Sequence, residues 1–306
     1  MARECTGRKI DLAARLLVAA GFLLWCGVAA AQELVHFPSS DDNGPGQPAT
    51  VLDGYLLRPA GDGRHPAVVF LHGCGGLFGG GLFDRMRGLI EPGERDWAGE
   101  LTRRGYVVLM VDSFRPRDRG EQCSQRDREA LELYRKRPPD AYGALLFLQT
   151  QPFVRPDRVA VIGWSQGGGA VLLAIGAQSL GRPAQMPQGD FGAAVAFYPT
   201  SCNTQFKGAS WTSAIPLLVL VGDGDVTHPA AACKSFLDGA TARGATVEMQ
   251  IYPGAYHHFD WPDVPRHELP SLRNAEGAVP IYGTDPAARQ DAFSRVPAFL
   301  GKYLPN

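Results

Sequence analysis

The stretch that most constrains the fold is VAVIGWSQGGGAVLLA, residues 159–174. An apolar run rich in Val ends at Gly163, Ser165 follows, and helix-forming sequence begins almost at once. Gly167 and Gly168 stand where a side chain would collide with the preceding strand. A strand that passes so sharply into a helix is typical of a parallel sheet covered by helices.

The rest of the chain repeats this alternation. Apolar, strand-like runs lie at residues 66–72, 106–112, 158–163, 192–198, 216–222 and 247–252, after a short strand at 54–58. Helical patterns lie at 95–104, 126–151 with a break at Pro138-Pro139, 166–177, 229–243 and 285–303. Most runs are apolar on both faces, as buried parallel strands are. We therefore predict an α/β fold with a mostly parallel central sheet and helices on both faces.

The first 31 residues are typical of a secretory signal peptide. An apolar run, residues 16–30, follows a basic start and ends in small residues before Gln32. A lipoprotein reading based on Cys26 is disfavoured because the bulky Trp25 precedes it. We expect an exported protein, periplasmic or secreted, in which residues 32–306 form one domain.

Charge and composition exclude several classes of function. The formal net charge of −1 offers no basic surplus for nucleic acid or a membrane surface. No Cys or His pattern with zinc spacing is present, so we expect neither metal nor cofactor. A monomer or small homo-oligomer acting on a small molecule fits these limits.

Ser165 is the candidate nucleophile. It occupies the centre of G-x-S-x-G in the strand–turn–helix context that gives this motif its meaning. The turn lifts the hydroxyl out of the sheet and leaves the Gln166 N–H free to bind an oxyanion. The competing interpretation is a Gly-rich turn with an idle serine.

A serine nucleophile needs a base and an acid that orients the base. Asp223 and Asp225 directly follow the strand at 216–222, and His257 and His258 follow the strand at 247–252. Because parallel strands end at the same edge of a sheet, all four lie where a triad is expected. Adjacent residues point in different directions, so one of each pair is a bystander.

A second oxyanion donor is expected after the strand at 66–72. FLHGCGGLFGGG follows, and its glycines allow backbone N–H groups to approach a substrate. We choose the N–H of Cys74 as the partner of Gln166. His72 is expected to be tied to backbone rather than to take part in chemistry.

The chain resembles the dienelactone hydrolase family of α/β-hydrolases, in particular its exported members. The resemblance rests on LHGCGGL, VDSFRPR, GWSQGG, VGDGDVTHPAAAC, YPGAYHHF and DPAARQDAFSRVPAFLGKYL. It implies that Asp225 is the acid and His257 the base, with His258 at the rim. The enzyme that names the family has a cysteine where Ser165 stands, so a plain ester or thioester is a safer expectation than dienelactone.

Four cysteines remain after residue 31, and export makes them candidates for disulfides. Cys202 and Cys233 follow neighbouring predicted strands, which leaves Cys74 with Cys123. Free buried thiols, or a reactive Cys74, are the alternatives.

Five further residues are weaker candidates for substrate contacts. Trp164 and Phe78 could line an acyl pocket, and Arg115, with Arg117 and Arg119, could bind a carboxylate. The arginines equally fit a solvated loop.

We therefore predict a serine hydrolase that cleaves a carboxylic ester, lactone or thioester through an acyl-enzyme. A peptidase of related fold and an exported binding protein with a vestigial triad are the alternatives. A dinucleotide-dependent oxidoreductase is disfavoured because no G-x-G-x-x-G opens the glycine-rich loop.

Overall fold

The computed structural model describes residues 32–305, except residues 42, 45, 79–87, 126, 180 and 275–276 and the side chain of Phe206. The predicted signal peptide, residues 1–31, lies outside the described residues. Within the described part of the chain, none of the helices has both the length and the apolar character that crossing a membrane requires.

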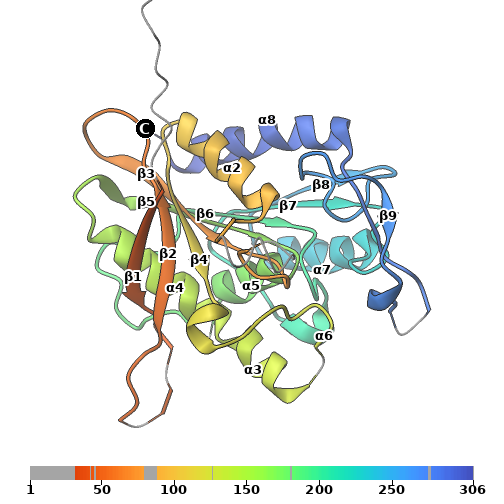
Figure 1. The fold of residues 1–306 in the computed structure, drawn as a ribbon, viewed down its shortest axis with the longest axis horizontal. Coiled ribbons are helices and arrows are strands. Elements are labelled where there is room, and N and C mark those ends of the chain that lie inside the picture. Colours follow the sequence, from red (N-terminus) through yellow and green to blue (C-terminus); the bar gives the residue numbers. More distant parts are fainter. Residues whose placement is uncertain are drawn as a thin grey trace, which may run out of the picture.

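An eight-stranded sheet runs through the molecule in the order β1-β2-β4-β3-β5-β6-β7-β8 (Figure 1). The strands are β1 (Glu33–Pro38), β2 (Val51–Leu57), β3 (His65–Leu71), β4 (Val107–Asp112), β5 (Val154–Trp164), β6 (Ala193–Phe197), β7 (Leu217–Gly222) and β8 (Val247–Tyr252). From β4 to β8 every neighbouring pair is parallel, whereas β1 and β2 are antiparallel additions at one edge. The predicted mostly parallel sheet is confirmed.

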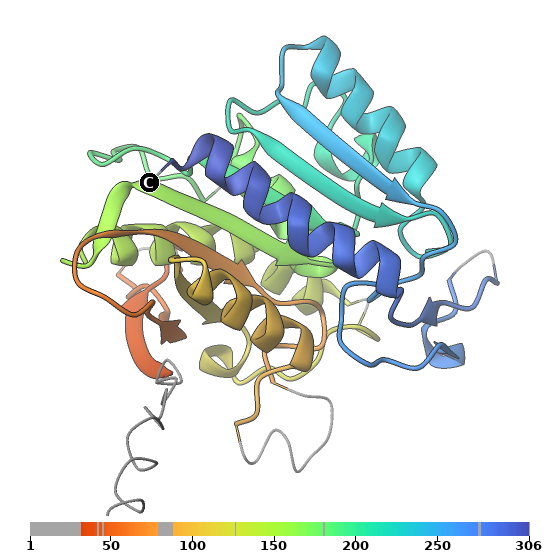
Figure 2. The same cartoon turned by 90° about the horizontal axis from the view of Figure 1, so that it is seen from above.

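Helices cover both faces of this sheet. They are α2 (Pro92–Arg103), α3 (Arg128–Arg135), α4 (Arg137–Gln149), α5 (Gln166–Ile175), α6 (Thr204–Lys207), α7 (Ala230–Ala242) and α8 (Pro286–Tyr303). Helices α2 and α8 lie across one face, as Figure 2 shows from above, and α4, α5 and α7 lie across the other. With both faces covered, the strands need the continuous apolar runs seen in the sequence.

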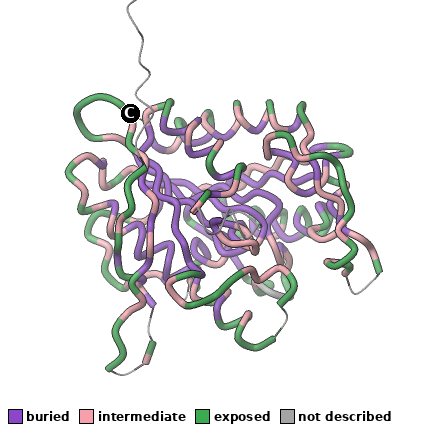
Figure 3. Tube along the Cα trace, in the orientation of Figure 1, coloured by how far each residue is buried: buried purple, intermediate pink, exposed green. Residues whose placement is uncertain are grey.

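The core lies on both sides of the central strands. Every residue of β4, β6 and β7 is buried, and Figure 3 shows the central strands buried while exposed residues lie mainly on loops, outer helix faces and the edge of the sheet. Burial of this apolar surface is the main force that fixes the sheet, and with it the loops at the strand ends.

Three parts of the structure differ from the sequence-based prediction. Strand β1, the short helix α6 and a small hairpin of β9 (His267–Glu268) and β10 (Ile281–Tyr282) were not expected. The helix break falls at Lys136, before the two prolines, because Pro138 and Pro139 lie in the first turn of α4, where a missing N–H costs nothing.

Candidate active site

Ser165 lies at the junction of β5 and α5 in a strained backbone conformation. Its φ is 53° and its ψ −113°, a left-handed geometry that non-glycine residues seldom adopt. The glycines of the motif explain how the turn closes: a Cβ on Gly163 would collide with the Gly167 carbonyl, and one on Gly167 with the Leu71 carbonyl. Strain of about 1–3 kcal/mol at such a position is held by the surrounding packing.

Asp225 and His257 form a buried pair at the same edge of the sheet. His257 Nδ1 donates to Asp225 Oδ2 over 2.6 Å, and both side chains are 1% exposed. The other oxygen, Asp225 Oδ1, accepts from the backbone N–H and the hydroxyl of Thr227 and from the backbone N–H of His228. The carboxylate is therefore fixed in orientation before any substrate arrives.

The surroundings set the charge of both partners. Burial alone would raise the pKa of Asp225, but the imidazoles of His257 and His228 outweigh it and hold the pKa well below its usual value. Burial lowers the pKa of His257, and the nearby Asp225 only partly offsets this. The pair therefore consists of a carboxylate and a neutral imidazole near pH 7.

His257 Nε2 is buried and has no hydrogen-bond partner among the described residues. No hydrogen bond within that part of the chain joins it to Ser165 Oγ. The structure thus contains the predicted hydrogen bond between the Asp225 carboxylate and the His257 imidazole. The predicted hydrogen bond between the His257 imidazole and the Ser165 hydroxyl is absent from the described residues.

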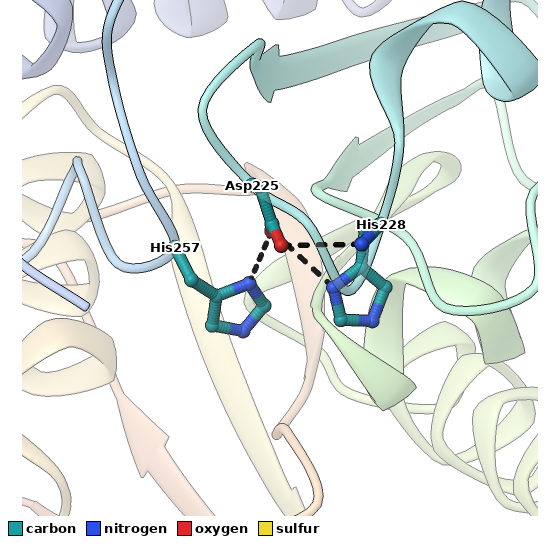
Figure 4. A group of neighbouring side chains, drawn as sticks. All are labelled: Asp225, His228 and His257. Carbon is teal, nitrogen blue, oxygen red and sulfur yellow. Dashed lines mark hydrogen bonds and ion pairs between the residues drawn. The ribbon is translucent and has the colours of Figure 1, made fainter. Parts of the chain in front are cut away.

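A second histidine, His228, binds the same carboxylate (Figure 4). Its Nδ1 lies 3.3 Å from Asp225 Oδ2, its Nε2 lies 2.9 Å from Thr200 Oγ1, and its ring stacks on that of His257 with 4.8 Å between centroids. His228 was not predicted from the sequence, although its place three residues after Asp225 in VTHP is a usable signal.

Asp225, His228 and His257 offer ligand atoms within 4.8 Å of one another, close enough to hold a metal ion. Hydrogen bonds to Asp225 Oδ2 already account for both imidazole distances. The geometry of the group is explained without a metal.

The remaining members of the predicted pairs have structural roles. Asp223 accepts from the Gly254 N–H over 2.6 Å and so holds the turn after β8. His258 has a φ of 62° and stacks on Trp261, with 3.9 Å between ring centroids. His72 bonds its neighbour's carbonyl, Gly73 O, over 2.7 Å, so it is tied to backbone as expected.

The two predicted oxyanion donors belong to residues that line the same cavity as Ser165. Gln166 begins α5, and Cys74 lies in the loop after β3; neither amide donates a hydrogen bond to the described residues. Cys74 is bonded to Cys123, and its carbonyl accepts from the Gln122 N–H over 2.7 Å. The disulfide and this hydrogen bond therefore fix the loop that carries the Cys74 amide.

Both predicted disulfides are present, Cys74–Cys123 and Cys202–Cys233. The alternatives of free thiols and of a reactive Cys74 are therefore wrong for this structure.

A cavity of about 350 Å³ opens on Ser165. Its wall has more apolar than polar surface and is formed by Cys74, Gln122, Cys123, Gln166, Thr200, Ser201, Thr227, His228, Leu272 and Tyr282. The last two belong to the segment between β8 and α8, whose local structure the sequence did not predict.

The predicted substrate contacts Trp164, Phe78 and Arg115 do not line this cavity. Trp164 is 1% exposed and donates from Nε1 to the buried Asp260 over 2.9 Å. The Arg115 guanidinium lies 3.5 Å from the ring centroid of Phe78, beside a different and smaller cavity. Trp164 faces the core because β5 extends through it and places its side chain within the packed layer.

The other two loop arginines are held by carboxylates. Arg117 binds Asp140 over 2.7 Å and Asp41 over 3.2 Å, and Arg119 binds Glu129 over 2.5 Å. These bonds fix the loop after β4 against more distant parts of the chain.

Comparisons with known proteins place this geometry among hydrolases. A family model described as "Dienelactone hydrolase family" matches residues 52–304. The Bradyrhizobium sp protein named "Probable 2-oxo-3-(5-oxofuran-2-ylidene)propanoate lactonase" is 26% identical over 213 residues, covering 67% of this chain and 77% of that protein. The Bacillus subtilis (strain 168) protein named "Putative hydrolase YtaP" is 32% identical over 120 residues, and the match spans 37% of this chain and only 40% of that protein.

The fold is similar to that of Thermogutta terrifontis esterase 2, solved in a form phosphonylated by cyclosarin. The TM-score is 0.60 at 17% identity, with 91% of this chain and 97% of the esterase covered. The family match runs from the second strand of the sheet to the end of the last helix, and the chain belongs to the dienelactone hydrolase family.

Proposed function

We propose that the chain is a serine hydrolase that cleaves carboxylic esters or lactones through an acyl-enzyme. The observation that carries this is the strained Ser165 at the start of α5, facing a cavity beside a preformed Asp225–His257 pair. Strained non-glycine residues at the mouth of a cavity persist where function requires them. The family and the named lactonase and esterase relatives support the same class of reaction.

In this mechanism, His257 acts as the general base. It is neutral because burial lowers its pKa, its Nδ1–H is held by Asp225, and Nε2 is free to accept the Ser165 proton. The serine–imidazole hydrogen bond has to form as substrate enters, since such contacts are often long without substrate. Ser165 Oγ then attacks the carbonyl, and the Cys74 and Gln166 amides bind the oxyanion. The intermediate expels the alcohol, which takes the proton from His257, and water deprotonated by His257 then hydrolyses the acyl-serine to release the acid.

The cavity favours compact substrates, because it is small and its largely apolar wall carries only a few hydrogen-bonding groups. Thr200, Ser201 and Gln122 present hydrogen-bonding groups, and the guanidinium of Arg115 lies outside the lining. We therefore expect short esters and lactones to be cleaved better than long-chain esters. Thioesters and peptides are tested alongside them.

The decisive experiment compares Ser165→Ala with Ser201→Ala, a matched control that removes another hydroxyl from the same cavity. Both are assayed on a panel of p-nitrophenyl esters, lactones, thioesters and peptides. We expect Ser165→Ala to lose more than about a thousandfold in kcat and Ser201→Ala to stay within about tenfold. Full esterase activity in Ser165→Ala would refute the proposal, and a lack of activity in the wild type would favour a binding protein.

We also propose that the protein works in an oxidising compartment outside the cytoplasm. The two disulfides support this, because such bonds persist mainly where thiols are not kept reduced. Sequencing the N-terminus of the protein recovered from the periplasm or medium should give Gln32 first. An intact Met1 in a cytoplasmic fraction would contradict this.

A further inference from the structure

A buried arginine lies behind both predicted oxyanion donors. Arg137, at the start of α4, is 0% exposed. Its guanidinium donates to Gln166 Oε1 over 3.1 Å and to the His72 carbonyl over 2.8 Å. One acceptor belongs to the residue whose amide starts α5, and the other lies two residues before Cys74. A single rigid group therefore joins the two segments that carry the donors.

Arg137 and the nearby Arg117 differ in how carboxylates balance their positive charges. Arg117 forms ion pairs with Asp41 and Asp140, whereas none of the described carboxylates forms an ion pair with Arg137. Arg137 Nε also has no partner in the described part of the chain. Asp140, one turn along the same helix, has both oxygens bonded to Arg117.

Burial of this kind is unfavourable for folding. A buried cation whose hydrogen bonds go to neutral oxygens loses its hydration, and the carboxylates of Asp140 and Asp112 offset this only partly, through space. Burial lowers the pKa of Arg137 to about 10, so the group stays protonated near pH 7. The face of the Phe114 ring, 5.2 Å from the guanidinium carbon, is its other compensation. The folded protein therefore holds a positive charge that nearby carboxylates balance only in part and without an ion pair among the described residues.

We propose that Arg137 is a positioning residue for the oxyanion hole, which fixes the Cys74 and Gln166 amides relative to each other and stabilises the negative charge that forms between them. This rests on the proposed function, since the anion it serves appears only during attack by Ser165. A fixed charge in a low-dielectric interior acts on a developing oxyanion more strongly than on a neutral ester. Arg137 should thus affect the transition state and leave substrate binding almost unchanged.

The test uses Arg137→Met, Arg137→Lys and the control Arg117→Met. The control removes another guanidinium that is only 12% exposed but does not contact His72 or Gln166. Folding is followed by circular dichroism and urea unfolding. Activity is followed as kcat and KM on a p-nitrophenyl ester, together with the affinity for a trifluoromethyl ketone, whose adduct with a serine carries an oxyanion.

We expect Arg137→Met to lose about ten- to a hundredfold in kcat, with KM within about threefold and a matching loss of ketone affinity. Arg137→Lys keeps the positive charge but not both hydrogen bonds. Its kcat and its ketone affinity should lie between those of Arg137→Met and those of the wild type. Arg117→Met should unfold at lower urea yet keep kcat within about threefold.

The inference is overturned if folded Arg137→Met keeps its kcat, if the loss appears in KM alone, or if Arg117→Met loses as much. Should Arg137→Met not fold, Arg137→Lys decides: weaker ketone binding at constant KM supports the inference, and unchanged ketone binding overturns it. An unchanged kcat in Arg137→Met, in an enzyme that depends on Ser165, contradicts this inference alone. Activity that survives Ser165→Ala removes the proposed function and this inference together.

Discussion

Removing the Cys74–Cys123 bond should reduce both stability and catalysis, whereas removing Cys202–Cys233 should reduce mainly stability. The bonds close loops of 49 and 31 residues. In the chain-entropy description, loops of this size contribute about 4 kcal/mol each to the free energy of unfolding, and they differ by only a few tenths. The two double alanine variants should therefore be destabilised to a similar extent.

Their effects on kcat should differ because only Cys74 and Cys123 line the cavity. Cys74 also supplies a predicted oxyanion amide, and losing such a donor costs about 3 kcal/mol of transition-state stabilisation, roughly a hundredfold in rate. We expect the Cys74→Ala/Cys123→Ala variant to approach that loss and the Cys202→Ala/Cys233→Ala variant to stay within about tenfold.

Urea unfolding followed by tryptophan fluorescence gives the stability of each variant. Ester hydrolysis well below the unfolding midpoint gives kcat for the folded fraction alone. Equal kcat losses in the two variants, or a normal kcat without the Cys74–Cys123 bond, would show that this disulfide does not position the oxyanion loop.

Three further predictions concern the acid and the base. Burial lowers the pKa of His257, and the neutral imidazole is the active form, so the acid limb of the kcat/KM profile should lie below pH 6.5. A pH profile with its acid limb above pH 7 would disagree. Asp225→Asn should lose about 10⁴-fold in kcat by analogy with other triads, whereas Asp223→Asn, which only weakens a turn, should lose less than about tenfold. If steady-state kinetics rank the two variants the other way, Asp223 is the acid. His228→Leu should lower kcat about three- to tenfold. It should also move the acid limb of the kcat/KM profile to higher pH, since the His228 imidazole lowers the pKa of His257. An unchanged pH profile would show that His228 does not act on His257.

The sequence predicted the strand ends well because parallel strands buried on both faces leave a strong apolar signal. Ser165, Asp225 and His257 each come shortly after such a run, so the topology brings all three to the same edge of the sheet. The disulfides were predictable for the same reason, since Cys202 and Cys233 follow neighbouring strands.

The parts that were not predicted depend on partners far away in the sequence. The sequence suggested Trp164 as a pocket residue, but in the structure its Nε1–H donates to Asp260, which lies 96 positions later in the chain. Arg137 lies beside the predicted helix break at Pro138-Pro139, and nothing local in the sequence shows that Gln166 and His72 accept its hydrogen bonds.

The most direct test of the account is to locate the serine that reacts. The protein is treated with a fluorophosphonate, digested and analysed by tandem mass spectrometry, with Ser165→Ala and His257→Gln in parallel. We predict a single adduct on Ser165 in the wild type, much slower labelling in His257→Gln, and none in Ser165→Ala. Labelling at another residue, or at the same rate without His257, would contradict a hydroxyl activated by the Asp225–His257 pair.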